Sequence, residues 1–320
     1  MNASKSKQAQ PHVSVLRDET IRLLNVKPGG RYIDGTLGAG GHAAAILEES
    51  MTAELLGIDR DESALIHAAE RLEADERRVH LERGTFDQMA MLAESIGWSS
   101  VDGILLDIGV SSMQIDQADR GFSYRQDGPL DMRMDRRSPM TASNLLNSAE
   151  RGELIRIFRE YGEEPRARRL AEAIIERREE QPWERTAELS QLVQDVLGRK
   201  GKRSHPIESR IFQAIRIAVN DELGMLQRAL DQALPLLAPE GRLVVITFHS
   251  LEDRMVKQRM RDWALDCICP PGLPVCACDK KQEVKVLTRK PITASEDELA
   301  LNPRAASAKL RCCEKLIPEN

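Results

Sequence analysis

A glycine-rich segment from Asp34 to His42 is the part of the sequence best suited to hold a ligand. It reads Asp-Gly-Thr-Leu-Gly-Ala-Gly-Gly-His, follows a short apolar segment and precedes a helical pattern. Glycines permit positive φ angles and let a ligand approach the backbone, and the N-terminus of the following helix offers free N–H groups. Asp59 ends the next apolar segment, where a carboxylate can accept both hydroxyls of an adenosine ribose.

The acid that opens this loop narrows the choice of ligand. The segment matches neither the Gly-x-Gly-x-x-Gly of dinucleotide sites nor the Gly-Lys-Ser/Thr of phosphate-binding loops. Asp34 would repel a phosphate but suits a ligand with an ammonium or sulfonium group. We therefore expect S-adenosylmethionine as the cofactor, while a glycine turn that only packs a strand on a helix is the competing interpretation of the loop alone.

Two more residues at the ends of apolar segments are candidates for the same site. Phe86, in Gly84-Thr85-Phe86, could flank an adenine ring. Asp107 ends Leu105-Leu106-Asp107, and ligands of open α/β sheets bind at the carboxyl ends of the strands. Its carboxylate could meet the cofactor's amino acid group or a substrate amine, and a helix N-cap or a turn is an equally good interpretation of this aspartate.

The elements that must position these residues alternate along the first third of the chain. We predict strands at 31–34, 54–59, 79–83 and 101–107, with helices at 41–50, 61–74 and 86–96 between them. A short helix at 13–26 precedes them. Such alternation is typical of βαβ units and of a parallel sheet covered on both faces.

The alternation stops after Asp107 and resumes late in the chain. Residues 111–140 lack clear periodicity, and 150–198 are strongly helical, with Leu154, Ile155, Phe158 and Tyr161 on one face. A helix at 208–237 and a buried strand at 241–248 follow. We predict an α/β domain in two parts, 1–112 and 207–320, split by a helical substrate-recognition domain at 113–206.

Composition and charge bound the class of protein. The chain has 320 residues, 41% hydrophobic and 30% charged, with a formal charge of −5, so it is not a wholesale basic nucleic-acid binder. The apolar run 243–248 is far too short to span a bilayer, which takes about 20 residues. Residues 1–10 are polar, so we expect no secretory signal and a cytoplasmic, membrane-free protein.

Four of the six cysteines are clustered near the C-terminal end. They form two Cys-x-Cys pairs, at 267 and 269 and at 276 and 278. Structural zinc sites usually use Cys-x₂₋₄-Cys, so the spacing favours reduced structural cysteines or an oxidation-prone surface loop, with a zinc-bound loop left open. We assign no metal ligand from the sequence and place Cys312 and Cys313 in a terminal strand at 309–314.

Taken together, these motifs resemble those of the bacterial small-subunit ribosomal RNA cytosine-N4 methyltransferase family. The similarity extends over most of the chain and keeps the family's order. It is carried by His12, Asp18-Glu19, 34–42, 58–61, 102–112, 120–123, 127–134, 161–164, 212–214, Arg216-Ile217, 248–254 and 302–307.

The resemblance implies a class I, Rossmann-like methyltransferase sheet with an inserted helical domain. It also implies methyl transfer from S-adenosylmethionine to the N4 amine of a cytidine at the decoding site of 16S ribosomal RNA. The implied partner is this RNA, within the assembled small subunit, and a homodimer is left open. Carried over residue by residue, the implied cofactor positions are Gly40, Gly41, His42, Asp59, Phe86, Asp107 and Gln114.

The chemistry needs groups that position a poor nucleophile, because the lone pair of cytosine's amine is delocalised into the ring. Asp107, or the groups of 109–112, could hold the amine's hydrogens and stabilise developing positive charge. His249 ends the last long apolar strand and is a candidate proton acceptor. A hydrogen-bonded structural histidine is the slightly favoured alternative for His249.

Recognition of the RNA points to the arginines of the insertion. Residues 113–220 hold 18 Arg, 2 Lys and 18 acids, so a salt-bridged, solvated surface is the better interpretation for most of them. A protein that binds an adenosyl ligand without catalysis, and a methyltransferase acting on a protein or small molecule, remain alternatives. Our preferred RNA contacts are Arg120, Arg125, Arg133, Arg136 and Arg137.

Overall fold

The computed structural model describes residues 14–73, 77–110, 112–198, 206–270 and 276–318. His12 and Ser111, which belong to the motifs above, lie outside these residues. The chain divides into two compact units, one made of 1–108 and 229–320 and the other of 109–228. No described helix combines the length and the apolar character needed to cross a membrane.

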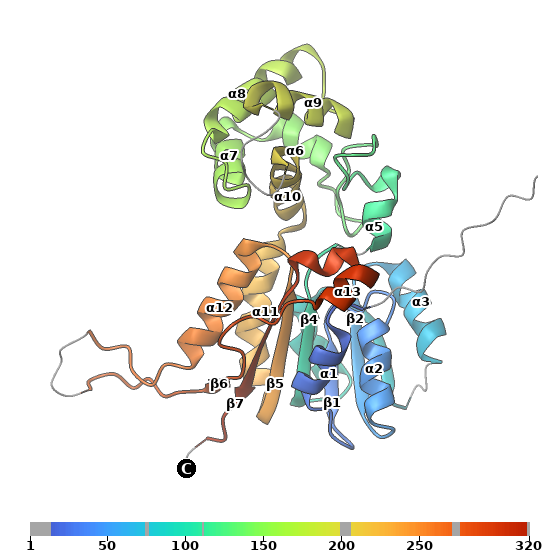
Figure 1. Ribbon diagram of the computed structural model, residues 1–320, viewed down its shortest axis with the longest axis vertical. Coiled ribbons are helices and arrows are strands. Elements are labelled where there is room, and N and C mark those ends of the chain that lie inside the picture. The colour runs from blue at the N-terminus through green and yellow to red at the C-terminus, as the bar shows by residue number, and fades with distance from the viewer. Residues whose placement is uncertain (1–13, 74–76, 111, 199–205, 271–275, 319–320) are drawn as a thin grey trace, which may run out of the picture. The chain divides into compact units, whose positions relative to one another are not determined.

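A seven-stranded sheet forms the centre of the first unit, in the order β3-β2-β1-β4-β5-β7-β6 (Figure 1). The strands from β3 to β5 pair in parallel, whereas β7 is antiparallel to both of its neighbours. Their bounds are β1 Arg31–Asp34, β2 Glu54–Asp59, β3 Val79–Arg83, β4 Val101–Asp107, β5 Leu237–Thr247, β6 Val284–Val286 and β7 Lys309–Lys315.

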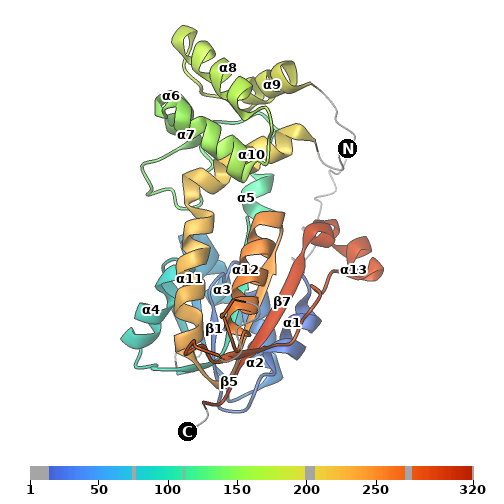
Figure 2. The same ribbon diagram turned by 90° about the vertical axis from the view of Figure 1, so that its left-hand side faces the viewer.

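Helices cover both faces of this sheet, as the continuous apolar strands require. Figure 2 shows α1 and α2 on one side and α4 and α11 on the other. Strand residues Tyr32, Leu55 and Leu105 share a buried cluster with Leu24 and Ile46. The helices and helical turns of this unit are α1 Arg17–Leu24, α2 Gly41–Glu49, α3 Glu62–Leu72, η1 Phe86–Gln88, α4 Met89–Ser95, α12 Ser250–Trp263, α13 Glu296–Leu301 and η4 Pro303–Ser307, with α11 Glu222–Leu236 entering from the other unit.

The second unit is helical and has its own apolar core. Trp183, fully buried, donates its indole N–H to the carbonyl of Ile174 at 3.2 Å and lies under the guanidinium of Arg177. Leu154 and Phe158 belong to this core, with Ile155 and Tyr161 packed against it. Its elements are α5 Ser112–Asp116, η2 Ala118–Arg120, α6 Ala142–Ser148, α7 Arg151–Arg156, the π-helical turn η3 Ile157–Tyr161, α8 Ala167–Glu180, α9 Thr186–Leu197 and α10 Ile207–Asn220.

The structure confirms the predicted parallel strands and differs from the sequence prediction in several elements, of which three bear on the architecture. The expected helix at 208–237 is two helices, because Asp221 adopts a left-handed conformation (φ 48°) between α10 and α11. Strand β6 was not predicted. The helical unit runs to Arg228 rather than to 206, because α10 buries Ile211, Phe212 and Ile215 in its core.

Candidate cofactor site

The glycine loop leaves β1 at its carboxyl end and is tied to the strands on both sides. Gly35 N–H donates to the carbonyl of Leu105 on β4 (2.9 Å), and Leu37 N–H donates to that of Ile58 on β2 (3.0 Å). Gly40 has φ 73°, and a Cβ there would lie 3.3 Å from the Cα of Ala68 on α3. The loop therefore needs glycine at this position for its conformation and for its packing.

Asp59 anchors the other side of the loop. Its Oδ2 accepts the N–H of Gly38 at 2.8 Å, and its Oδ1 accepts that of Asp61 at 2.8 Å. Burial raises the pKa of this carboxyl, while the two N–H donors oppose the shift. A carboxylate has about four lone-pair positions, so Asp59 retains acceptor capacity for the hydroxyls of a ribose.

Asp34, His42 and Asp107 place polar atoms without partners at the same edge of the sheet. Within the described part of the chain, Asp34 Oδ2, both ring nitrogens of His42 and Asp107 Oδ1 are buried and make no hydrogen bond. Buried polar atoms are nearly always hydrogen-bonded, so these atoms fit a bound ligand that carries both donors and acceptors.

The electrostatics of this group centre on Asp34, which is almost fully buried. Burial raises the pKa of its carboxyl to about 6, His42 lowers it, and the nearby carboxylates Asp107 and Asp59 raise it further. The predicted cofactor residues of β1, β2 and β4 thus interact at one place. A cationic ligand group would stabilise the ionised form of Asp34.

Asp107 is held by its backbone while its side chain points into this group. Its N–H donates to Thr36 Oγ1 at 2.6 Å, and its Oδ2 lies 3.6 Å from His42 Nε2. Thr36, which joins the glycine loop to the end of β4, was not predicted from the sequence. The one feature of the sequence that could have indicated this contact is the hydroxyl side chain two residues after Asp34.

Phe86 also lies against the glycine loop. It is buried in η1, and its Cβ would be 3.0 Å from a Cβ placed on Gly35. Gln114, the remaining predicted cofactor residue, is buried in α5 of the other unit. Its role at the site, like the adenine contact of Phe86, stays a prediction.

His249 is the N-cap of α12. Its Nδ1 accepts the backbone N–H of Glu252 at 3.4 Å, and its Nε2 lies 3.0 Å from Glu252 Oε1. Glu252 in turn accepts the N–H groups of Phe248 and His249. The capping contacts support the structural interpretation of His249, although its buried Nε2 makes no hydrogen bond to a described residue. Its catalytic role remains a prediction. The sequence analysis missed the capping-box pattern, in which a glutamate follows the N-cap residue by three positions. Here that glutamate is Glu252.

The arginines preferred as RNA contacts fall into two groups. Arg120 is buried and donates to the carbonyls of Arg133 and Met134, so its prediction as an RNA contact is wrong. Arg133 pairs with Asp131 at 2.8 Å and donates to two carbonyls of its own loop, which also assigns it to loop structure. Arg125, Arg136 and Arg137 are exposed.

The strand order, the antiparallel β7 and the acidic glycine loop define a class I methyltransferase that uses S-adenosylmethionine. The model of the MraW methylase family matches residues 9–316. The chain belongs to this family.

Curated relatives cover nearly the whole chain. A protein of Heliobacterium modesticaldum is 50% identical over 309 residues, which are 95% of this chain and 98% of that protein. One of Symbiobacterium thermophilum is 51% identical over 308 residues, 95% of this chain and 96% of that protein. One of Brevibacillus brevis is 47% identical over 308 residues, with shares of 95% and 98%. All three are named ribosomal RNA small subunit methyltransferase H.

Proposed function

We propose that this protein transfers a methyl group from S-adenosylmethionine to the N4 amine of a cytidine at the decoding site of 16S ribosomal RNA. The relatives' shared name supports small-subunit ribosomal RNA as the substrate. The observation that carries the chemistry is that Oδ1 of Asp107, at the carboxyl end of β4 beside the glycine loop, has no hydrogen-bond partner in the described part of the chain. A cytoplasmic location follows from this substrate.

When bound, the cofactor supplies an electrophilic methyl group on a sulfonium sulfur. The protein must hold that group in line with the amine nitrogen, because positioning supplies much of the acceleration for such a weak nucleophile. Asp59 and the loop 34–42 would hold the nucleoside and amino acid ends. The target base must leave any stack to reach this edge of the sheet.

Asp107 would orient the amine. Its Oδ1 would accept one N–H of the exocyclic amine and stabilise the positive charge that develops as the carbon–nitrogen bond forms. The amine then loses one proton, for which the same carboxylate is an acceptor at hydrogen-bond range. Phe86 would flank the adenine, and Gln114 would complete the cofactor contacts.

We propose the assembled small subunit as the substrate in preference to free RNA, because a base at the decoding site is presented by a large folded structure. The test is labelled methyl transfer to purified small subunits, to their extracted RNA and to large subunits. We expect one labelled cytidine N4 in small subunits by mass spectrometry.

Label on another atom or on a ribosomal protein would overturn the assignment. Uptake of the cofactor without transfer to any of the three substrates would favour a binding protein. Light scattering on the same preparation tests the homodimer that the sequence leaves open.

A further inference from the structure

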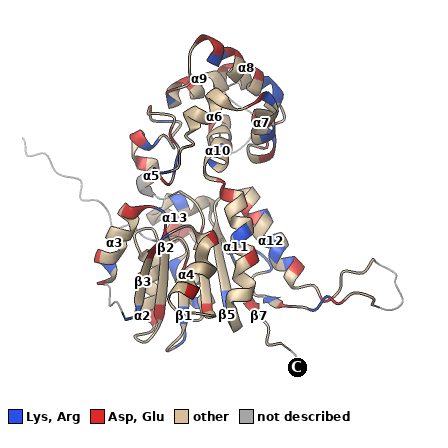
Figure 3. Cartoon of the chain, turned by 180° about the vertical axis from the view of Figure 1, so that it is seen from behind, with Lys and Arg blue, Asp and Glu red and all other residues tan. Residues whose placement is uncertain are grey.

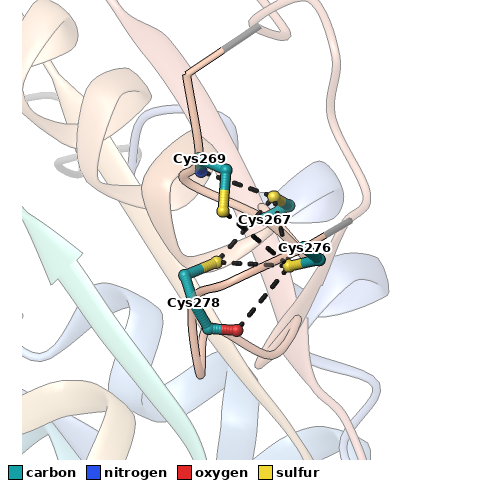
Figure 4. Close-up of side chains that lie close together, drawn as sticks. All are labelled: Cys267, Cys269, Cys276 and Cys278. Carbon is teal, nitrogen blue, oxygen red and sulfur yellow. Dashed lines mark hydrogen bonds between the residues drawn. The ribbon is translucent and has the colours of Figure 1, made fainter. Parts of the chain in front are cut away.

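The segment between α12 and β6 brings four thiols together at a place that the proposed reaction does not use. We call them the four-cysteine cluster: Cys267, Cys269, Cys276 and Cys278. The first two follow α12, and the last two lie on the stretch of chain that returns toward β6. All four side chains point toward one another (Figure 4). All of these cysteines are free.

The sulfur-to-sulfur distances have the size of a metal–thiolate tetrahedron. They are 3.6 Å for Cys267–Cys276 and for Cys276–Cys278, 3.8 Å for Cys278–Cys267 and 3.9 Å for Cys269–Cys276. A tetrahedral ion with zinc–sulfur bonds of about 2.3 Å requires edges of about 3.8 Å. A disulfide would require about 2 Å, and an iron cluster with bridging sulfide would hold the thiolates farther apart.

Backbone N–H groups point at three of the four sulfurs. Ile268 N–H donates to Cys278 Sγ at 3.3 Å, Ala277 N–H to Cys269 Sγ at 3.3 Å, and Cys269 N–H to Cys267 Sγ at 3.4 Å. Such hydrogen bonds stabilise thiolates and orient them toward a metal. The Cys-x-Cys spacing, unusual for zinc, is therefore compatible with four converging ligands in this chain.

Apolar burial does not explain why the segment folds. Between Trp263 and Val284, which are both buried, none of the described residues is buried, and Ile268 is 65% exposed. The two ends of the segment are joined by a hydrogen bond from Glu283 N–H to the carbonyl of Trp263 (2.9 Å). Long connections without a core or an internal staple are uncommon in compact domains.

We propose that the four-cysteine cluster is a structural site for a single tetrahedral metal ion, preferentially Zn²⁺. Four protein ligands leave no open coordination position, so the ion cross-links the two halves of the segment and takes no part in methyl transfer. Each thiol gives up its proton to solvent as the ion binds. This departs from the interpretation that the sequence spacing favours, which is reduced cysteines without metal.

The first test is metal analysis of the full chain purified under reducing conditions without chelator. We expect about one zinc per chain. Replacement by Co²⁺ should give thiolate-to-cobalt charge-transfer bands and the strong visible bands of tetrahedral coordination. Absence of metal together with no cobalt–thiolate spectrum, or iron accompanied by inorganic sulfide, would overturn the proposal.

The second test asks whether metal binding depends on the cysteines themselves or on other residues of the segment. The pair of variants Cys267→Ser and Cys276→Ser should each lose the ion, whereas Ile268→Ser in the same segment should keep it, since only its backbone contacts a sulfur. Hydrogen exchange of residues 264–283 should become faster in both cysteine variants and remain unchanged in the control. Retention of one ion per chain by a variant that carries both Cys267→Ser and Cys276→Ser would contradict the assignment.

Discussion

Asp107 combines a fixed backbone with a side-chain oxygen that has no hydrogen-bond partner among the described residues. This arrangement is expected of a group that meets a reacting amine. Asp107→Asn keeps the size and the Thr36 contact but removes the charge. We expect turnover to fall about 10²-fold or more, measured as labelled methyl transfer to small subunits. Calorimetry with S-adenosylhomocysteine separates this loss from a loss of cofactor affinity.

Asp102→Asn is the matched control for this variant. Asp102 lies at the other end of β4, where its Oδ2 accepts the N–H of Arg31 at 2.9 Å. An asparagine retains that acceptor, so turnover should be unchanged. Full turnover and unchanged cofactor affinity in Asp107→Asn would remove Asp107 from the mechanism.

Asp34 predicts a pH dependence of stability that is opposite to that of a salt-bridged aspartate. Burial raises the pKa of its carboxyl from 3.8 to about 6. Between these values the folded chain keeps a proton that the unfolded chain has lost. The contribution of Asp34 to the free energy of unfolding therefore falls as the pH rises through this window, by up to about 3 kcal/mol.

Asp34→Asn removes this titration. The stability of the variant relative to the parent should increase between about pH 4 and about pH 7, as measured by denaturant unfolding without cofactor. Carboxylates remote from Asp34 titrate alike in both proteins and cancel in the difference. A difference that stays constant over this window would show that Asp34 titrates normally.

The acids of the site were predictable because each ends a strand of a parallel sheet. Asp34, Asp59 and Asp107 follow apolar segments, and parallel strands present their carboxyl ends at one edge. Neither the Thr36 contact nor the burial of Arg120 has such a signal. An arginine in a polar loop gives no indication of whether it pairs with phosphate or, as here, with carbonyls of its own chain.

The glycine loop is an element whose conformation can be tested by comparing two glycines. Gly40 and Gly29 have similar φ angles of 73° and 70°, but only Gly40 is packed against another element. Gly29→Ala should cost about 1 kcal/mol of unfolding free energy from backbone strain. Gly40→Ala should cost more and weaken cofactor binding, because the added Cβ displaces the loop from α3. Equal effects of the two changes on cofactor affinity would contradict a role for loop packing.

Two variants at the N-terminus of α12 can distinguish a capping role of His249 from a catalytic role. His249→Ala removes the acceptor for Glu252 N–H and should lower the free energy of unfolding by about 1 kcal/mol. Asparagine is a good N-cap, so His249→Asn should restore most of the stability and the turnover. Loss of turnover in a fully stable His249→Asn protein would instead place His249 in the reaction.

Elements that belong to the repeated βα pattern were predictable, whereas elements or breaks outside that pattern were not. The four residues of β1 are preceded and followed by turns and belong to a repeated βα pattern. The three residues of β6 carry no such pattern, and among the described strands they pair only with β7. The break at Asp221 was also missed, because an aspartate inside a helical pattern does not by itself show a left-handed conformation.

The whole chain carries its charges in nearly balanced form, which argues against binding RNA through bulk attraction. In the helical unit, Lys and Arg residues are interspersed with Asp and Glu residues along α7, α8 and α9 (Figure 3). Many of them form surface pairs, such as Arg151 with Glu172 and Arg156 with Glu160. Specific contacts must then come from a few arginines that can exchange a weak intramolecular partner for a phosphate.

Three exposed arginines of the 120–140 loop meet this description. Arg136 and Arg137 pair with Asp119 and Asp135, and Arg125 stacks on Tyr124. Replacing all three by serine should weaken binding to small subunits and reduce the slope of log affinity against log salt by about 0.7–0.9 for each phosphate that is no longer neutralised. Replacing Arg151, Arg156 and Arg159 by serine removes the same charge from α7 and η3 of the same unit and should change affinity little. Equal reductions in affinity for the two triple variants would mean that net charge, and not this loop, governs the interaction.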